Sequence, residues 1–182
     1  RDVTTLVVPH RDIRKLDLFL GPGGQSCVPD PSAPFDFLAV EKTGHSDGYS
    51  VRDSAGREWK VKIGEEAQAE LVVSRILWAI GFHQPVTYYV RDWSMSEVSS
   101  RRLGPAKFRL ESDHEKKGQW RWGRNPFVGT RELHGLLVAN LVLNNWDLVT
   151  DNNRVYQTRL ASGEKSTWYV VQDVGGSLGK SS

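Results

Sequence analysis

The chain has one cysteine, Cys27, so it holds no intrachain disulfide and no zinc site built from several cysteines. It has no apolar run close to the roughly 18 residues that a membrane-spanning helix needs. Basic residues exceed acidic ones by only 24 to 22, and surfaces that bind nucleic acid usually carry a much stronger basic bias. We therefore expect a soluble protein that neither crosses a membrane nor binds nucleic acid.

A length of 182 residues and a hydrophobic share of 38% are sufficient to bury a core without disulfides or metals, in one domain or in two small lobes. The sequence begins at Arg1 and its single methionine is Met95, so we expect the natural start, with any signal peptide, to lie upstream. Its end, directly after a glycine-rich stretch, also indicates a C-terminally truncated piece of a longer protein. The cellular location is therefore left open.

The apolar pattern predicts an α+β fold with two lobes. We expect an N-terminal arm over residues 1–34, an antiparallel sheet with one main helix over 35–111, and a connector with the start of a helical second lobe over 112–182. The predicted segments are strands near 35–39, 49–52 and 59–63, a helix over 65–80, strands at 86–90 and 106–110, a helix over 130–143, and a hairpin of 155–158 with 168–172.

The strand at 59–63 and the helix after it carry a candidate phosphate site. Lys62 ends the strand, and Glu70 lies one to two turns into the helix. Phosphoryl transfer uses a cation over the nucleotide phosphates and a carboxylate that fixes that cation in place. We interpret Lys62 and Glu70 as such a pair, and Lys60, on the same strand face, is an alternative to Lys62.

A second candidate lies in the polar segment after the helix at 130–143. Asp147 is followed at the fifth position by Asn152. An aspartate in such a loop orients or deprotonates an acceptor hydroxyl, and an asparagine at this offset reaches a divalent metal through its carbonyl oxygen. Asparagine and aspartate also accumulate in ordinary turns, so this segment alone is equally compatible with a turn.

A third candidate is Asp173, which leaves the last predicted strand directly before a Val-Gly-Gly run. Glycine lets the backbone turn sharply, so a carboxylate in this position can approach a metal ion closely. Such turns are common in proteins, so Asp173 is a candidate metal ligand only in combination with the other two candidates.

The order of these segments is more specific than any one of them. A strand lysine, a helix glutamate, an Asp-x-x-x-x-Asn loop, a hairpin and an Asp-x-Gly turn follow one another as the working parts of protein kinases do. Gly44, Ser46 and Gly48 lie between the first two strands, where kinases cover the phosphates. From about residue 35 to residue 179, the chain resembles the atypical protein-kinase-like family, in the divergent group that includes HipA-type, phosphoinositide and secretory-pathway kinases.

The resemblance is closer to uncharacterised bacterial kinase-like proteins that carry the motifs Trp59-Lys60-Val61-Lys62, Asn125-Pro126-Phe127, Asn144-Asn145-Trp146-Asp147-Leu148 and Asn152-Asn153. It implies ATP as the nucleotide and Mg²⁺ or Mn²⁺ as the metal. It also implies roles for the candidates. Lys62 and the loop glycines would contact the phosphates, and Glu70 would pair with Lys62. Asp147 would be the catalytic aspartate, with Asn152 and Asp173 as metal ligands. The phosphate acceptor is left open.

An ATP- and Mg²⁺-dependent phosphotransferase is therefore the leading hypothesis, and two others stay open. A pseudokinase-like module would bind a nucleotide or a partner without transferring phosphate, and the presence of Asn145-Trp146 before Asp147, where kinases carry His-Arg, favours it. A metal-dependent phosphohydrolase would use Asp147, Asp151 and Asp173, although two-metal sites usually draw on more carboxylates and on histidine.

Overall fold

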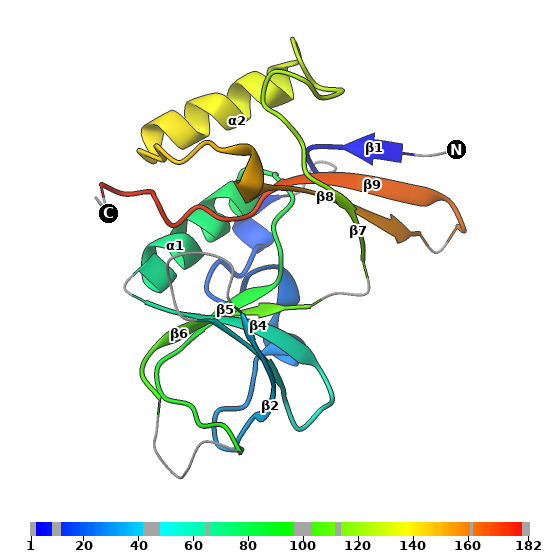
Figure 1. Ribbon diagram of the computed structural model, residues 1–182. Coiled ribbons are helices and arrows are strands. Elements are labelled where there is room, and N and C mark those ends of the chain that lie inside the picture. Colours follow the sequence, from blue (N-terminus) through cyan, green and yellow to red (C-terminus); the bar gives the residue numbers. More distant parts are fainter. Residues whose placement is uncertain are drawn as a thin grey trace.

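The computed structural model describes residues 3–8, 12–41, 48–64, 66–96, 103–111, 114–160 and 162–179. Within these ranges the fold is α+β, with two α-helices and two sheets rich in antiparallel pairs (Figure 1). No helix of these ranges has the length and apolar character that crossing a membrane requires. The elements are β1 (Val3–Thr5), β2 (Asp36–Glu41), β3 (Gly48–Arg52), β4 (Glu58–Ile63), α1 (Glu66–Ala79), β5 (Thr87–Val90), β6 (Ala106–Leu110), β7 (Glu115–Gly118), α2 (Arg131–Val142), β8 (Asn153–Arg159) and β9 (Lys165–Val171).

The first sheet has the strand order β2-β3-β4-β6-β5, and each neighbouring pair in it is antiparallel. The predicted three-stranded meander is confirmed as β2, β3 and β4, and the two later strands are confirmed as β5 and β6. The helix predicted after the meander is confirmed as α1. It ends before Gly81, whose φ of 106° lies in the left-handed region that glycine adopts without a steric penalty.

One face of the first sheet is apolar because large side chains alternate along its central strands. Trp59 and Val61 of β4 and Phe108 of β6 are 0–2% exposed and pack in one cluster. Phe35 and Trp93 cover them, with Phe35 and Phe108 ring centroids 5.0 Å apart. Because side chains alternate between faces, the residues between these aromatic and aliphatic groups point to the opposite face.

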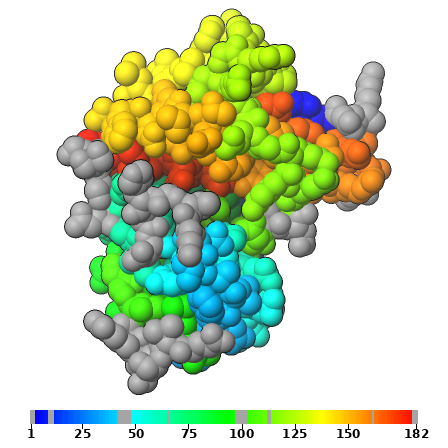
Figure 2. Space-filling view, viewed as in Figure 1, coloured from blue at the N-terminus to red at the C-terminus, as the bar shows by residue number. Residues whose placement is uncertain are grey.

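The second sheet has the order β1-β9-β8-β7. The predicted hairpin is confirmed as β8 and β9, while β1 and β7 were not predicted. The sequence Glu115–Gly118 of β7 is exposed throughout and lacks apolar alternation. β1 pairs in parallel with β9, with Val3 beside Ser166, and Leu6 is buried at 2% exposure. The expected separate arm is thus partly built into the second sheet, where Figure 2 shows the blue atoms of β1 against the orange of β9.

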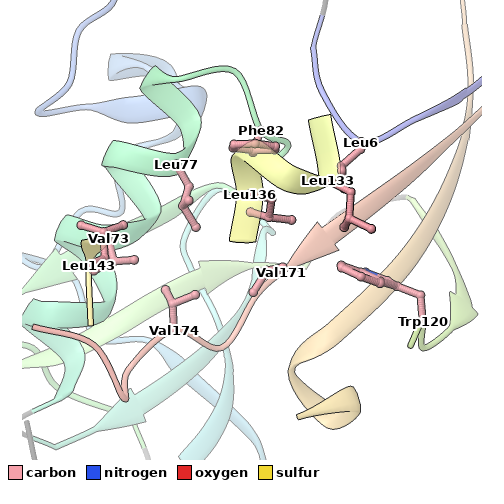
Figure 3. Close-up of a cluster of buried hydrophobic side chains, with 10 residues drawn as sticks. All are labelled: Leu6, Val73, Leu77, Phe82, Trp120, Leu133, Leu136, Leu143, Val171 and Val174. Carbon is pink, nitrogen blue, oxygen red and sulfur yellow. The ribbon is translucent and has the colours of Figure 1, made fainter. Parts of the chain in front are cut away.

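A second core joins the two sheets through the helices. Its buried members are Leu6, Val73, Leu77, Phe82, Trp120, Leu133, Leu136, Leu143, Val171 and Val174 (Figure 3). α1 and α2 each contribute two or more of these side chains, and the chain leaving β9 contributes Val174 between them. α2 begins at the cap Thr130, whose hydroxyl accepts a bond of 3.2 Å from the Leu133 amide. This core fixes the segment after β9 against both helices.

The face of α2 turned away from this core is exposed and apolar. Val138, Leu141 and Val142 are 59%, 80% and 77% exposed. The predicted start of a helical second lobe corresponds, within the described ranges, to this one helix packed beside a sheet.

Candidate functional site

A cleft of about 310 Å³ lies between the two sheets. The first sheet contributes β-strand residues from its non-apolar face, and the second contributes residues of β7 and β8 and the segment after β9. The lining residues are Glu41, Gly48, Lys60, Val61, Lys62, Lys107, Arg109, Lys116, Arg154, Gln172 and Asp173. The cleft therefore contains Lys62, Gly48 and Asp173 from the predicted site.

A larger apolar groove of about 1200 Å³ lies elsewhere, between α1, β5 and residues 13–32. The described residues that line it include none of the predicted site residues. Lys62, Gly48 and Asp173 thus line the smaller, charged cleft, whereas Glu70, Asp147 and Asn152 are not among its lining residues.

Four cations form a grid on the cleft-facing side of the first sheet. In the register of β4 against β6, Lys62 lies opposite Lys107 and Lys60 lies opposite Arg109. Like charges directly opposite each other on neighbouring strands destabilise a sheet. Their juxtaposition is compatible with a stable fold because carboxylates neutralise part of the charge, and it leaves a surface suited to anions.

Lys62 lies where the two sheets meet. Its Nζ is 3.3 Å from Glu66 Oε2 and 3.6 Å from Asp173 Oδ1. Burial alone would lower the pKa of Lys62, but the charges of Glu70, Asp173 and Glu66 together raise it above its usual value. Lys62 therefore stays protonated, and it bridges the start of α1 and the segment that follows β9.

The expected ion pair between Lys62 and Glu70 is not formed directly. Glu70 instead contacts Lys107, and both side chains are almost fully buried, at 3% and 6% exposure. Lys107 is the cross-strand neighbour of Lys62, and Glu66, one turn before Glu70, takes the position beside Lys62. Glu70 thus has a different partner from the one expected, because the register of β6, a strand distant in sequence from β4, places Lys107 beside Lys62.

The Lys107–Glu70 pair is a feature that the sequence analysis missed. The available signal was a second alternation, Lys107-x-Arg109, which repeats the Lys60-x-Lys62 pattern on the neighbouring strand. Burial raises the pKa of Glu70, while the Lys107 and Lys62 charges oppose this shift. Glu70 Oε2 is buried and has no hydrogen-bond partner within the described ranges.

Asp147 and Asn152 are brought into direct contact. The Asn152 side-chain Nδ2 donates to the backbone oxygen of Asp147 at 2.8 Å and to its carboxylate Oδ2 at 2.9 Å. Both partners are acceptors, so the amide nitrogen must face them and Oδ1 must point the other way. This orientation leaves an amide oxygen, the atom that ligates divalent metals, directed away from Asp147.

The loop that carries Asp147 is tied to the interior of α2. Asn140, fully buried, accepts a 2.7 Å bond from Asn145 Nδ2, and Asn145 Oδ1 accepts a 3.2 Å bond from the Asp147 amide. Asn144 ends the helix with a φ of 51°, a left-handed conformation that asparagine tolerates. Asn145, present where protein kinases carry histidine, thus positions Asp147 by hydrogen bonds, a role that the sequence alone did not indicate.

Asp173 reaches the same region through backbone pairing. The Gln172 amide donates to the Asn152 carbonyl oxygen at 2.9 Å, so Asp173 immediately follows a residue bonded to the Asp147 loop. Gly176 lies against this loop, because a Cβ there would be 3.0 Å from the Asp147 Cβ. Burial alone would raise the pKa of Asp173, but the Lys107 and Lys62 charges lower it below its usual value.

Other predicted residues lie outside this cluster. Gly44 and Ser46 lie outside the described residues, while Gly48 begins β3 and lines the cleft. Lys60, the alternative to Lys62, is bonded to Glu41 and points into the same cleft. Asp151 Oδ1 accepts a 3.0 Å bond from Gln119, and Asp147, Asp151 and Asp173 do not form a metal-holding group among the described residues.

The donor set fits a metal that is shared with phosphate. In the part of the chain that the structure describes, no group of three or more His, Cys, Asp and Glu side chains is arranged to hold a metal ion. Mg²⁺, however, is usually held by one or two protein carboxylates, with water and substrate phosphate oxygens completing its shell. Asp173 and Asn152, whose segments are joined by the Gln172–Asn152 backbone bond, supply a carboxylate and an amide oxygen of that kind.

Comparison with protein-family profiles, with curated proteins and with solved structures finds no match for this chain. Function is therefore inferred from the residues and geometry of the cleft.

Proposed function

We propose that the protein is an ATP- and Mg²⁺-dependent phosphotransferase of the protein-kinase-like type. The observation that carries the proposal is the approach of Lys62 Nζ to within 3.6 Å of Asp173 Oδ1, which joins two motifs from opposite sheets. In protein kinases, the lysine that holds the nucleotide phosphates and the aspartate that holds the metal converge in the same way.

The positions of these residues in the fold support the same proposal. Lys62 lies on β4, the third strand of its sheet in chain order, and the helix that follows carries Glu70. Kinases place their lysine on the third strand and their glutamate on the next helix. Asp147 and Asn152, with the spacing of a kinase catalytic loop, lie beside the Asp173 segment.

Each side chain has a defined task in the proposed reaction. Lys62 holds nucleotide phosphate oxygens, and the buried contact between Lys107 and Glu70 lies behind it and fixes the cationic face. Asn152 and Asp173 would hold the metal, which when bound neutralises charge on the phosphates. Asp147 faces the acceptor and accepts its hydroxyl proton.

The transfer is an in-line displacement. The acceptor hydroxyl oxygen forms a bond to the γ-phosphorus as the bond from that phosphorus to the β-γ bridging oxygen breaks. ADP leaves with the electron pair, and the hydroxyl proton passes to Asp147. Catalysis of this kind consists mostly of positioning and charge stabilisation, which a rigid, charged cleft supplies.

Calorimetric titration of Mg·ATP into the chain tests the first requirement. We expect Mg²⁺-dependent binding that Asp173→Asn weakens at least tenfold, because a carboxylate ligand of the metal is lost. Lys62→Met should weaken it comparably. Asp151→Asn is the matched control, because Asp151 lies on the same loop as Asp147 but its carboxylate bonds to Gln119. This variant should bind Mg·ATP as the wild type does.

Transfer of the labelled γ-phosphate of ATP to added alcohols then tests catalysis. Mg²⁺-dependent transfer that is lost in Asp147→Asn supports the proposal. Binding without transfer would assign the pseudokinase-like function instead. Mg·ATP binding that is absent, or that is equal in Asp173→Asn and the wild type, would contradict the nucleotide site.

A further inference from the structure

Two arginines of the cleft have no carboxylate partner. The other cleft cations are each paired, in the contacts Lys60–Glu41, Lys62–Glu66, Lys62–Asp173, Lys107–Glu70 and Lys116–Glu111. Arg154 Nη1 donates to the backbone oxygens of Asp151 and Asn153. For Arg109, no described residue accepts a hydrogen bond or forms an ion pair with it. Two guanidinium groups therefore face the cleft with most of their donors unused.

These two arginines belong to different sheets and line the same cleft. Arg109 lies on β6 and Arg154 on β8, and both line the same 310 Å³ cleft. Both charges also act on the phenol of Tyr156, whose hydroxyl donates to Gln172 Oε1. Tyr156 and Gln172 are buried, so their hydrogen bond is a fixed polar feature within reach of both arginine charges.

The energetics of this arrangement favour an anion. Arg109 lies directly opposite Lys60 in the sheet register, and the single carboxylate of Glu41 bonds to Lys60 and also acts on Arg109, so an excess of positive charge remains at this pair. Arginine presents its N–H groups in a planar fork that matches phosphate and carboxylate oxygens. Among the described lining residues, Val61 is the only one with an apolar side chain, so the cleft offers little apolar surface to a ligand.

We propose that Arg109 and Arg154 form a second anion subsite in the cleft, beside Lys62 and Asp173, and that it holds a phosphate group already present on the acceptor. The substrate class is thus a phosphorylated alcohol. This identification of the bound molecule as the acceptor rests on the proposed function, whereas the subsite itself rests only on the two arginines and the cleft.

Titration of glycerol 3-phosphate into the chain at constant ionic strength tests the subsite, with the arginine Nε–Hε resonances as the readout. We expect the signals of Arg109 and Arg154 to shift. The dissociation constant should rise about tenfold in Arg109→Gln and in Arg154→Gln, the scale of a lost charge-assisted hydrogen bond. Arg159→Gln, an exposed arginine on the same strand as Arg154, is the matched control and should bind within about twofold of the wild type.

The conservative variants guard against loss of folding. Arg109→Lys and Arg154→Lys keep the charge and lose the fork, so their affinity should lie between those of the wild type and the glutamine variants. Phosphatidic acid in phosphatidylcholine vesicles forms a parallel arm, in which the same phosphate is carried by a lipid. Tighter binding to these vesicles than to glycerol 3-phosphate would assign a lipid source, and the reverse would assign a free metabolite.

The outcomes separate this inference from the proposed function. We expect Asp173→Asn to lose Mg·ATP binding and retain glycerol 3-phosphate binding, and the arginine variants to show the opposite pattern. Glycerol 3-phosphate binding that is absent, that is unchanged in both glutamine variants, or that falls equally in Arg159→Gln would overturn the subsite. Mg·ATP binding that is unchanged in Asp173→Asn, together with glycerol 3-phosphate binding that depends on the arginines, would overturn the proposed function and leave the subsite in place.

Discussion

Replacement of Lys107 by methionine is the most direct test of the charged interior described here. Lys107 and Glu70 are in contact, and both side chains are almost fully buried. Lys107→Met keeps the length of the side chain and its packing, but it leaves Glu70 without its contacting cation. Lys62 remains near Glu70, although it is held by Glu66 and Asp173 rather than by Glu70.

The magnitude follows from that burial. Removal of one partner from a buried ion pair costs about 3 to 5 kcal/mol, because the remaining charge has lost both water and its counter-ion. Small domains are usually stable by about 5 to 15 kcal/mol, so the variant should lose a large share of its free energy of unfolding. In the double variant Lys107→Met with Glu70→Met, no charge is left uncompensated, so most of that loss should be recovered.

Urea unfolding at pH 7, followed by tryptophan fluorescence, measures these differences. The pH dependence provides a second readout, because burial raises the pKa of Glu70 above its unfolded value. A carboxyl with a raised native pKa binds its proton more tightly when folded, so it stabilises below the unfolded pKa and this contribution is lost as the pH rises. The deficit of Lys107→Met should therefore shrink as the pH falls toward about 4 to 5.

Two results would refute this reasoning. A loss below about 1 kcal/mol in Lys107→Met would mean that Glu70 carries no uncompensated charge in the folded state. A double variant as unstable as the single one would mean that packing, and not charge, accounts for the loss.

Three further predictions concern the loop after α2 and the turn after β3. Gly176→Ala places a Cβ 3.0 Å from the Asp147 Cβ, so it should lower the free energy of unfolding by about 1 to 3 kcal/mol in urea titration and weaken Mg·ATP binding; unchanged values would show that the loop yields freely. Asn145→Ala leaves the buried Asn140 without its 2.7 Å partner and should cost about 1 to 3 kcal/mol, whereas equal stability would remove Asn145 from the positioning network. Burial opposes the charged form of Asp53, but hydrogen bonds from Trp59 and Arg57 outweigh it and lower the pKa of Asp53. The stabilisation from the charged carboxylate is therefore present above about pH 4 and is lost as the pH falls. Asp53→Asn should reduce the loss of stability at acid pH, and an unaltered acid dependence would contradict this.

Much of the local structure was predictable from the sequence. Alternation of Trp59, Val61 and Ile63 with lysines specifies a strand with one buried face, and the same rule places Lys60 and Lys62 together on the other face. The Asp147–Asn152 contact is likewise local, since both residues lie in one short loop between α2 and β8. These features depend on neighbours within a few residues, which the sequence displays directly.

The choice of ionic partners was decided only by the tertiary structure. The sequence offers Lys60, Lys62 and Lys107 as possible partners for Glu70, and composition does not rank them. The antiparallel register of β4 and β6 sets Lys107 opposite Lys62, and the packing of α1 on that face brings Glu70 to Lys107 and Glu66 to Lys62. The residues that decide this pairing come from segments far apart in the chain.

The same division applies to the cleft as a whole. The amino-acid sequence determined which chemical groups are present and which face of each strand or helix they occupy, because side-chain periodicity is a property of the local backbone. The second core, in which α1 and α2 pack together with Val171 and Val174, determined that Asp173 meets Lys62 and that Arg109 and Arg154 line one cavity. Burial of apolar surface fixes such long-range placement, and it depends on how complete elements pack rather than on any short motif.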